Sequence, residues 1–291
     1  SDTDAILRSG RAYGVAAAIA VGVVAYMSGG VSGVEMGGAV AAVAPSGFCT
    51  NEPGYGAETD NPMSAETYTD WGAFNEDSEP QAWAEIGSDA TAPRSPNNVW
   101  AGRITNGWRT GFAPGSWGYT AYGGTDGLSA FYVCTAVKFS PNWIEAPNNI
   151  NKLMFATFSG GDPLVIIADS GEPAPDSSWF LQISTQGITN GNSVFGQNVT
   201  DTVYHNWGDW VELEVQVTRG DQDGQTGIVK AWIDGVLAIN YTDTITMDSS
   251  TVGFRNIRIE PTYHTGGSTV SLGSDTMSVL FDFVKITGTA N

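Results

Sequence analysis

The clearest pattern in the chain is an alternation of apolar and polar residues in WVELEVQV, residues 210–217. One set of alternate positions holds Val211, Leu213, Val215 and Val217, and the other holds Glu212, Glu214 and Gln216. Because successive side chains of a β-strand point to opposite faces, this segment predicts a strand with one core face and one solvated face. After the turn-rich TRGDQDGQTG, the segment IVKAWIDG at 228–235 is predicted to return antiparallel.

Further short segments rich in β-branched and aromatic residues are bounded by Gly, Pro, Asn or Asp. They are residues 128–139, 152–158, 164–169, 179–185, 254–263 and 277–288. No helical periodicity longer than two turns occurs after residue 100. The 37 Gly and 13 Pro are typical of a chain with many turns. The pattern therefore predicts an all-β fold, a sandwich of two antiparallel sheets.

The N-terminal region breaks this pattern, because residues 12–34 contain no charge. As a helix the stretch is about 34 Å long, enough for a bilayer core of ~30 Å. Gly14, Ala18 and Gly22 recur every four residues and form a smooth face for packing on other transmembrane helices. Arg8 and Arg11 precede the stretch, which predicts a single span in the cytoplasmic membrane, with the N-terminus inside and the C-terminal domain periplasmic or extracellular.

Three other interpretations of the N-terminal stretch stay open: a cleaved signal peptide, an apolar arm in an assembly such as a virion shell, and a buried helix. The preferred division has a cytoplasmic N-terminus and transmembrane helix at 1–35, a connecting segment at 36–93, Gly-rich and then acidic, and a sandwich domain at 94–291. The acidic part has aromatic residues, which favours an extended segment that partly wraps the main domain over a simple linker.

The net charge of the chain argues against two classes of ligand. The chain has 31 acidic and 12 basic residues, a net charge of −19, which argues against nucleic acid binding. It also argues against tight binding of anionic polysaccharides unless a metal ion bridges the charges. The two cysteines, Cys49 and Cys134, are a disulfide candidate in an oxidising compartment, and two unpaired thiols are the alternative.

Four segments together resemble the concanavalin A-like jelly roll of bacterial polysaccharide-lyase and laminin-G-type domains, over about residues 94–288. They are FYVCTAVKFSPNW, NNINKLMF, WGDWVELEVQV…GIVKAWIDGVLAINY and IRIEPTYHTGG…VLFDFVKITG. The resemblance implies a Trp-bearing strand, a hairpin into a strand with the W.DG pattern, and a late Asp-aromatic-Val pattern like Asp282-Phe283-Val284. It also implies a tight turn at Asp234-Gly235 and a core position for Trp232. The resemblance supports the fold more than any activity.

Lyases of this fold use a Tyr/His pair with Arg or Gln, so the resemblance makes Tyr263, His264 and Arg258 weak catalytic candidates. Arg255 and Arg258 are an odd number of positions apart, which predicts that they face opposite ways on one strand. Glu212 and Glu214 share a face as the acids of glycosidases do, but a solvated outer face is the preferred explanation.

Two kinds of ligand site stay open. Asp221 and Asp223 are spaced like the start of a calcium loop, and Ca²⁺ is common in this fold family. No distal Glu follows, which favours a hairpin loop without a cofactor. Trp143, Trp179 and Trp207, with Trp108 and Trp117, lie in or near predicted loops and are candidates for stacking on a neutral glycan.

The preferred function is a non-catalytic, membrane-anchored accessory or structural subunit of a larger membrane complex, with other transmembrane helices as partners. A bioenergetic or photosynthetic complex is an analogy from the layout alone. The alternatives are a neutral-glycan-binding module, a polysaccharide lyase-like enzyme and a virion surface protein, and the expectation for enzymatic activity leans to none.

Overall fold

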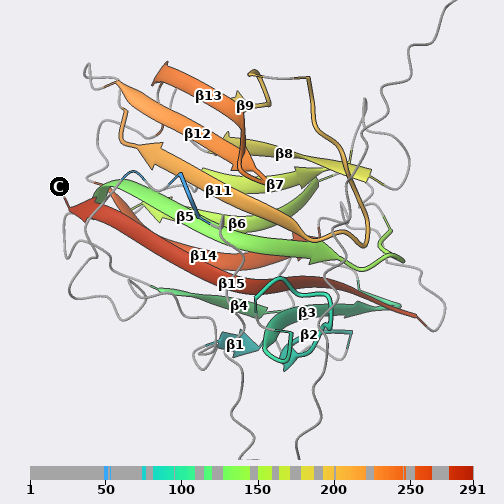
Figure 1. Cartoon of the computed structure of the whole chain (residues 1–291). Coiled ribbons are helices and arrows are strands. Elements are labelled where there is room, and N and C mark those ends of the chain that lie inside the picture. Colours follow the sequence, from blue (N-terminus) through green and yellow to red (C-terminus); the bar gives the residue numbers. More distant parts are fainter. Residues whose placement is uncertain are drawn as a thin grey trace, which may run out of the picture. The chain divides into compact units, whose positions relative to one another are not determined.

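Segments rich in β-branched and aromatic residues form strands throughout the described part of the chain (Figure 1). The computed structural model describes residues 49–51, 53, 74–76, 81–94, 96–108, 115–119, 127–144, 150–158, 164–170, 178–186, 193–199, 201–220, 226–244, 246, 253–263 and 275–290. Among these residues there is no helix, and every strand pair is antiparallel. The predicted all-β antiparallel class is confirmed.

The strands form two sheets. In the first sheet the order is β4 (Gly115–Tyr119), β14 (Phe254–Tyr263), β6 (Ile150–Phe158), β7 (Leu164–Asp169) and β8 (Ser178–Thr185). β1 (Phe74–Glu76) pairs with β4, while β9 (Val194–Phe195) and β10 (His205–Asn206) pair with β8.

In the second sheet the order is β2 (Ala82–Gly87), β3 (Val99–Thr105), β15 (Thr276–Ala290), β5 (Leu128–Phe139), β11 (Val211–Thr218), β12 (Gly227–Ile233) and β13 (Val236–Thr244). The sheets meet where Phe254 of β14 pairs with Leu128 of β5. Since β2 pairs with β3, the second sheet begins before residue 94.

One large apolar core lies between the sheets. Phe131 of β5 packs edge-on against Phe254 of β14 with ring centroids 4.8 Å apart. At another position Phe139 packs against three tryptophans. Its ring centroid lies 4.7, 5.5 and 5.0 Å from the ring centroids of Trp143, Trp179 and Trp207. Burial of each large apolar side chain contributes about 1.5–3 kcal/mol, so these aromatic groups are a main source of stability.

The hairpin of β11 and β12 has the predicted core face and antiparallel direction. Val211, Leu213, Val215 and Val217 are all buried, and β12 returns antiparallel. Asp234 and Gly235 both have positive φ, 48° and 77°, as the central residues of a type I′ turn do. Trp232 differs from its predicted core position. It pairs with Glu214 on the outer face of the second sheet and is half-buried, because the inward positions belong to Ala231 and Ile233.

Strand β13 is an edge of the second sheet in the described residues, and a neighbouring loop uses its backbone groups. The backbone N–H of Asn198 donates to the carbonyl of Ala238. The side chain of Asn198 accepts from the N–H of Asn240 and donates to its carbonyl, at 2.8 and 3.0 Å. The loop therefore occupies part of an otherwise open strand edge.

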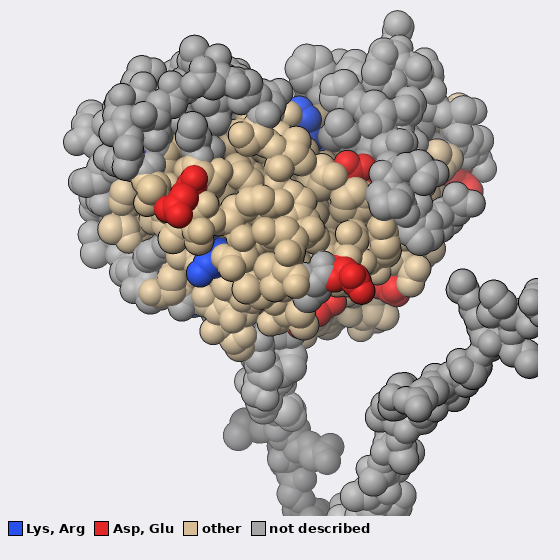
Figure 2. Space-filling model, turned by 90° about the horizontal axis from the view of Figure 1, so that it is seen from above, with Lys and Arg blue, Asp and Glu red and all other residues tan. Residues whose placement is uncertain are grey.

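The predicted transmembrane helix lies outside the described residues, as do its packing residues Gly14, Ala18 and Gly22 and the proposed division at 35/36. In the described part of the chain, no helix has the length and apolar character needed to span a bilayer. Figure 2 shows that uncharged residues form most of the described surface on one side of the molecule, with isolated Lys, Arg, Asp and Glu side chains.

Candidate active site

The outer face of the first sheet carries a small apolar floor. Phe155, Val165 and Ile167 form a buried cluster separate from the main core. Their neighbours Ala156, Leu164 and Ile166 belong to the core, so alternation along β6 and β7 places the three side chains on the other face. Phe155 and Val165 are register partners. Phe155, Val165 and Ile167 are 9%, 0% and 5% exposed, so the floor is a packed base beneath the charged groups and not a surface for a ligand.

Three charged side chains gather at this floor. Arg258 and Glu260 come from β14 and form an ion pair, while Lys152 comes from β6. Arg258 pairs in register with Phe155, and its guanidinium carbon lies 5.6 Å from the ring centroid. The Nζ of Lys152 lies 5.6 Å from the same centroid. Both distances are in the range of cation–π contacts, so the ring brings two cations to one place.

A β-bulge sets the position of Glu260. Ile259 pairs with Met154 and Thr262 pairs with Lys152, so Glu260 and Pro261 together lie against the one residue Leu153. Proline lacks an N–H and is tolerated within a sheet mainly at such irregular positions. Bulges commonly redirect a side chain beside a functional site. Here the bulge places a carboxylate between an arginine on its own strand and a lysine on the next.

The electrostatics of the three groups are coupled. Burial raises the pKa of Glu260, and the charges of Arg258 and Lys152 partly oppose this rise. Burial lowers the pKa of Lys152, and the charge of Glu260 partly opposes this fall. The Nζ of Lys152 also lies 3.5 Å from the Oε1 of Gln186. A lysine whose pKa is lowered has a larger fraction of neutral amine, the form that accepts a proton.

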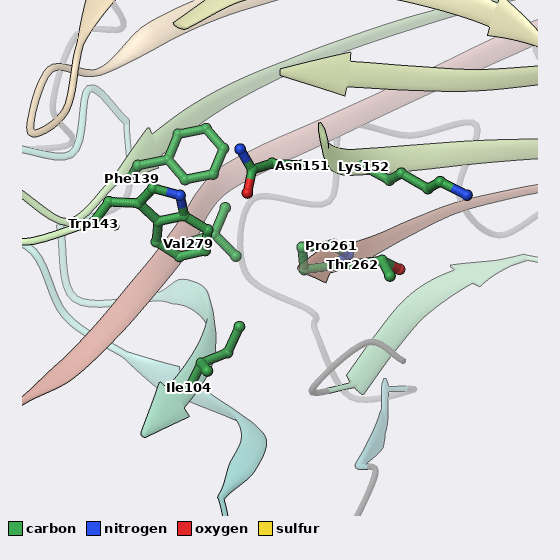
Figure 3. A pocket seen from close by; sticks show the side chains of 8 residues that line it. All are labelled: Ile104, Phe139, Trp143, Asn151, Lys152, Pro261, Thr262 and Val279. Carbon is green, nitrogen blue, oxygen red and sulfur yellow. The ribbon is translucent and has the colours of Figure 1, made fainter. Parts of the chain in front are cut away.

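A pocket lies near Lys152 but on the other side of its strand. Its lining comes from both sheets and is mostly apolar: Ile104, Phe139, Trp143, Asn151, Lys152, Pro261, Thr262 and Val279. Figure 3 shows Phe139, Trp143 and Val279 close together, while the Lys152 side chain extends away from them. The pocket is thus a gap at the rim of the core, and the charged groups that could do chemistry lie on the outer face.

The catalytic candidates from the sequence are only partly described. Arg258 lies in the charged cluster. Tyr263 ends β14, where its backbone pairs with Asn151, and its side chain lies outside the described part. His264 also lies outside it. The register shifts between Phe254 and Asn256, so the odd spacing of Arg255 and Arg258 does not fix their relative faces.

The tryptophans proposed for glycan stacking are core residues. Trp179, Trp143 and Trp207 are 0%, 7% and 8% exposed and pack around Phe139. Trp108 is 2% exposed, and Trp117 lies in β4 with a side chain outside the described part. The prediction that the described tryptophans stack on a sugar is corrected, because burial leaves no ring face for a ligand.

The outer face of the second sheet also differs from the solvated face expected for Glu212 and Glu214. A clasp, residues 49–51, covers it and is joined to β5 by the disulfide Cys49–Cys134. Glu214 is 0% exposed and accepts hydrogen bonds from the backbone N–H and side-chain amide of Asn51, at 2.8 and 2.9 Å, and from the Tyr132 hydroxyl at 2.5 Å.

Glu212 also holds the clasp, because its Oε1 accepts the N–H of Cys49 at 2.7 Å. Burial raises the pKa of Glu212 to about 7, and the charge of Glu214 adds to the rise. Beneath the clasp, Cys49, Tyr132, Cys134, Ala136 and Phe283 form a second buried cluster. This face is therefore a small core with a structural role.

No metal site emerges from the described residues. Cys49, Cys134 and Glu212 come together, but the two sulfur atoms bond to each other and are not available as thiolate ligands. Asp221 and Asp223, the calcium candidates, lie outside the described part.

Sequence reasoning missed Lys152, Glu260 and the clasp. The i, i+2 spacing of Arg258 and Glu260 was a usable signal, because it puts both on one face of a strand. No sequence signal joins Lys152 to them, since their proximity depends on the pairing of β6 with β14.

No protein-family model matches the chain, and no curated protein matches it. Its fold is similar to that of an alginate lyase variant in complex with an alginate tetrasaccharide, with a TM-score of 0.50, 12% identity, and coverage of 82% of this chain and 95% of that one. This likeness shows the fold. The resemblance to the polysaccharide-lyase jelly roll is thereby confirmed.

Two further solved structures are similar. The endo-β-1,4-glucuronan lyase of the fungus Trichoderma reesei has a TM-score of 0.49 and 15% identity, with 76% of this chain and 96% of that one covered. The alginate lyase of Klebsiella pneumoniae has a TM-score of 0.46 and 7% identity, with 66% and 82% covered.

The expected function is corrected by these comparisons. The sequence favoured a non-catalytic, membrane-anchored subunit, whereas the neighbour with a TM-score of 0.50 is an alginate lyase, an enzyme that cleaves a polysaccharide. The segment that motivated the first expectation, residues 12–34, lies outside the described residues.

Proposed function

We propose that the protein is a lyase that cleaves uronic-acid polysaccharides by β-elimination. The observation that carries the proposal is the pair of basic side chains, Arg258 and Lys152, beside Phe155 on the outer face of the first sheet. A polyuronate presents a carboxylate on every sugar, which a guanidinium complements by charge and by hydrogen bonding.

The reaction needs a base and a cation. The base removes the proton from the sugar carbon that bears the carboxylate, the bond from the neighbouring carbon to the glycosidic oxygen breaks, and a carbon–carbon double bond forms. Negative charge grows on the carboxylate in the transition state, where the guanidinium of Arg258 stabilises it. Lys152 is the base, because burial lowers its pKa and increases the neutral form.

The proton balance closes without a further group. Neutral Lys152 takes the proton from carbon and becomes an ammonium ion. The ammonium then donates a proton to the departing glycosidic oxygen, which leaves as a hydroxyl. Lys152 returns to its starting state, and the product carries an unsaturated end.

The comparisons support this substrate class. The neighbours act on alginate and glucuronan, which are both uronate polymers, and one of them is seen with an alginate tetrasaccharide. In that complex the enzyme has one lysine and one tyrosine replaced by alanine. A lysine occurs at the present cluster, and Tyr263 ends the strand that carries Arg258 and Glu260.

The acidic composition, with a net charge of −19, is compatible with this substrate class. The described cluster holds two basic side chains and one acidic side chain, the reverse of the excess of acidic residues in the whole chain. Long-range repulsion between solvent-exposed charges is screened beyond about 8–10 Å at physiological salt. Added salt is expected to improve activity on long polymers more than on tetrasaccharides.

The test is an incubation of the full chain with alginate, polyglucuronate and a neutral glucan, followed by the ultraviolet absorbance of unsaturated ends. Absorbance is expected to rise with a uronate polymer, not with the glucan. Lys152→Ala is expected to remove the signal. Lys230→Ala, on β12 of the second sheet, is the matched control and is expected to retain it. Activity on neither uronate polymer, or full activity of Lys152→Ala, would overturn the proposal.

A further inference from the structure

Glu260 occupies an unusual place for an acidic residue in a site for an anionic substrate. Its carboxylate is paired with the guanidinium of Arg258, the group assigned above to the substrate carboxylate. The side chains of Arg258 and Glu260 are 35% and 24% exposed, so an incoming ligand can reach the pair. In the free protein, Glu260 thus stands in for the substrate carboxylate.

The arrangement keeps Arg258 in place. The guanidinium packs over Phe155 on one side and is held by Glu260 along the strand. On the other neighbouring strand, β4, the register partner of Arg258 is Gly118, which has no side chain to occupy the adjacent space. The guanidinium is therefore fixed by two contacts and keeps donor groups for another carboxylate, since arginine carries five N–H donors.

We propose that Glu260 is a positioning and selectivity residue, which holds Arg258 ready in the free protein and gives up the guanidinium to a uronate carboxylate. The inference rests on the proposed lyase function. Selectivity follows because displacement needs a ligand that replaces one carboxylate by another. A neutral sugar has no carboxylate with which to displace Glu260 and would leave the ion pair in place.

Displacement changes the protonation of Glu260. The charged groups that act on it are Arg258 on its own strand and Lys152 on β6. Loss of the contact with Arg258 removes one of the interactions that favour the ionised form, while burial still favours the neutral form. Substrate binding is therefore linked to proton uptake and weakens as the pH rises.

The experiment compares wild type with Glu260→Gln, which keeps the shape and removes the charge. KM and kcat are measured on a uronate tetrasaccharide across pH, and proton uptake is measured by titration calorimetry in two buffers with different ionisation enthalpies. The variant is expected to take up fewer protons than wild type, to show a smaller rise of KM with pH, and to bind about threefold more tightly at alkaline pH, in line with a partly exposed ion pair. Because the charge of Glu260 raises the pKa of Lys152, the pH profile of kcat is expected to move to lower pH in the variant.

Glu85→Gln is the matched control, because Glu85 forms an ion pair with Arg103 at 2.9 Å on the second sheet. It is expected to leave KM, kcat and proton uptake unchanged. Glu260→Ala, measured in the same way, distinguishes positioning from simple competition. Glu260→Ala removes the side chain that holds Arg258 along the strand, so the KM of this variant is expected to rise above that of Glu260→Gln. Circular dichroism establishes that each variant is folded.

The outcomes separate this inference from the proposed function. If the wild type is inactive on uronate polymers, the lyase assignment itself is wrong. An active wild type with the same pH dependence in Glu260→Gln overturns only the role of Glu260. A large fall in kcat at unchanged KM would overturn it as well, because that result assigns Glu260 to the chemical step.

Discussion

Both outer faces of this sandwich carry a carboxylate in apolar surroundings. The partners of the two carboxylates differ. On the second sheet, Glu214 is completely buried and accepts hydrogen bonds from Asn51 and Tyr132. On the first sheet, Glu260 is partly exposed and has a guanidinium as its partner. The first carboxylate has fixed partners from the chain itself, and the second has a partner that a ligand can take.

The difference shows how a structural acid can be told from a functional one. A buried carboxylate with several fixed donors holds a segment in place, and removal of its donors costs stability. A carboxylate beside cations and an apolar floor leaves the cations available for exchange. Alternation in the sequence cannot distinguish the two faces. It indicates only which residues share a side of the strand, and not what covers that side.

The sharpest contrast between the faces is expected from their arginines. Arg258→Ala is expected to lower kcat/KM about 10³-fold, since it removes the group that stabilises the developing charge. Arg258→Lys is expected to recover only part of the loss, because lysine lacks the planar fork. Arg103→Ala on the second sheet is the control, with kcat/KM within twofold of wild type as measured by product absorbance. Equal losses in the two arginine variants would contradict the assignment of the site to the first sheet.

The disulfide should affect stability without affecting chemistry. Cys49→Ser removes a link between residues 85 positions apart and is expected to lower the free energy of unfolding by about 2–4 kcal/mol. Denaturant unfolding measures this loss, and product absorbance per folded molecule is expected to be unchanged. If activity falls while the fold persists, the clasp communicates with the first sheet and the two faces are not independent.

Removal of Glu214 should have the next largest effect. Glu214→Ala leaves the donors of Asn51 and Tyr132 without their acceptor and is expected to cost about 2–3 kcal/mol. Glu214→Gln keeps one carbonyl acceptor and is expected to cost less. Unfolding curves of both variants, compared with Glu260→Ala, check the contrast. A greater loss of stability in Glu260→Ala would reverse the roles given to the two acids.

The smallest effect is a pH dependence of stability from Glu212. Its pKa of about 7 in the folded protein is above its ordinary value of 4.5, so the folded state binds the proton more tightly than the unfolded state does. Its favourable contribution is complete below pH 4.5 and is lost as the pH rises to about 7. Solvent screening makes the effect modest, because Glu212 is half-buried. Glu212→Gln is expected to flatten the stability curve in this window, and an unchanged curve would contradict the assignment.

The sequence contained most of the fold but little of the site. The alternation in 210–217 defined a strand, its core face and its hairpin, because period and turn residues are local properties. The site needs the register between β6 and β14 and a bulge at Pro261, which are set by long-range packing. For the same reason Trp179 was misassigned, since a tryptophan near a predicted loop gives no indication of the side on which its ring lies.

The clasp was missed for a related reason. Its hydrogen bonds with Glu212 and Glu214 join residues 163 positions apart. A regular alternation with charged residues on one side ordinarily indicates solvent on that side. Only the structure shows that another part of the chain replaces the solvent there.

The loop at Asn198 has a consequence for how molecules behave at high concentration. Sheets with open edges can be extended by strands from other copies, which leads to aggregation. Here the backbone groups of Ala238 and Asn240 already have partners within the molecule. The nearby side chains of Val199 and Val236 are 45% and 55% exposed, so an open edge here would also present apolar surface to other molecules. One asparagine thereby occupies edge groups that a strand of a second copy would otherwise pair with.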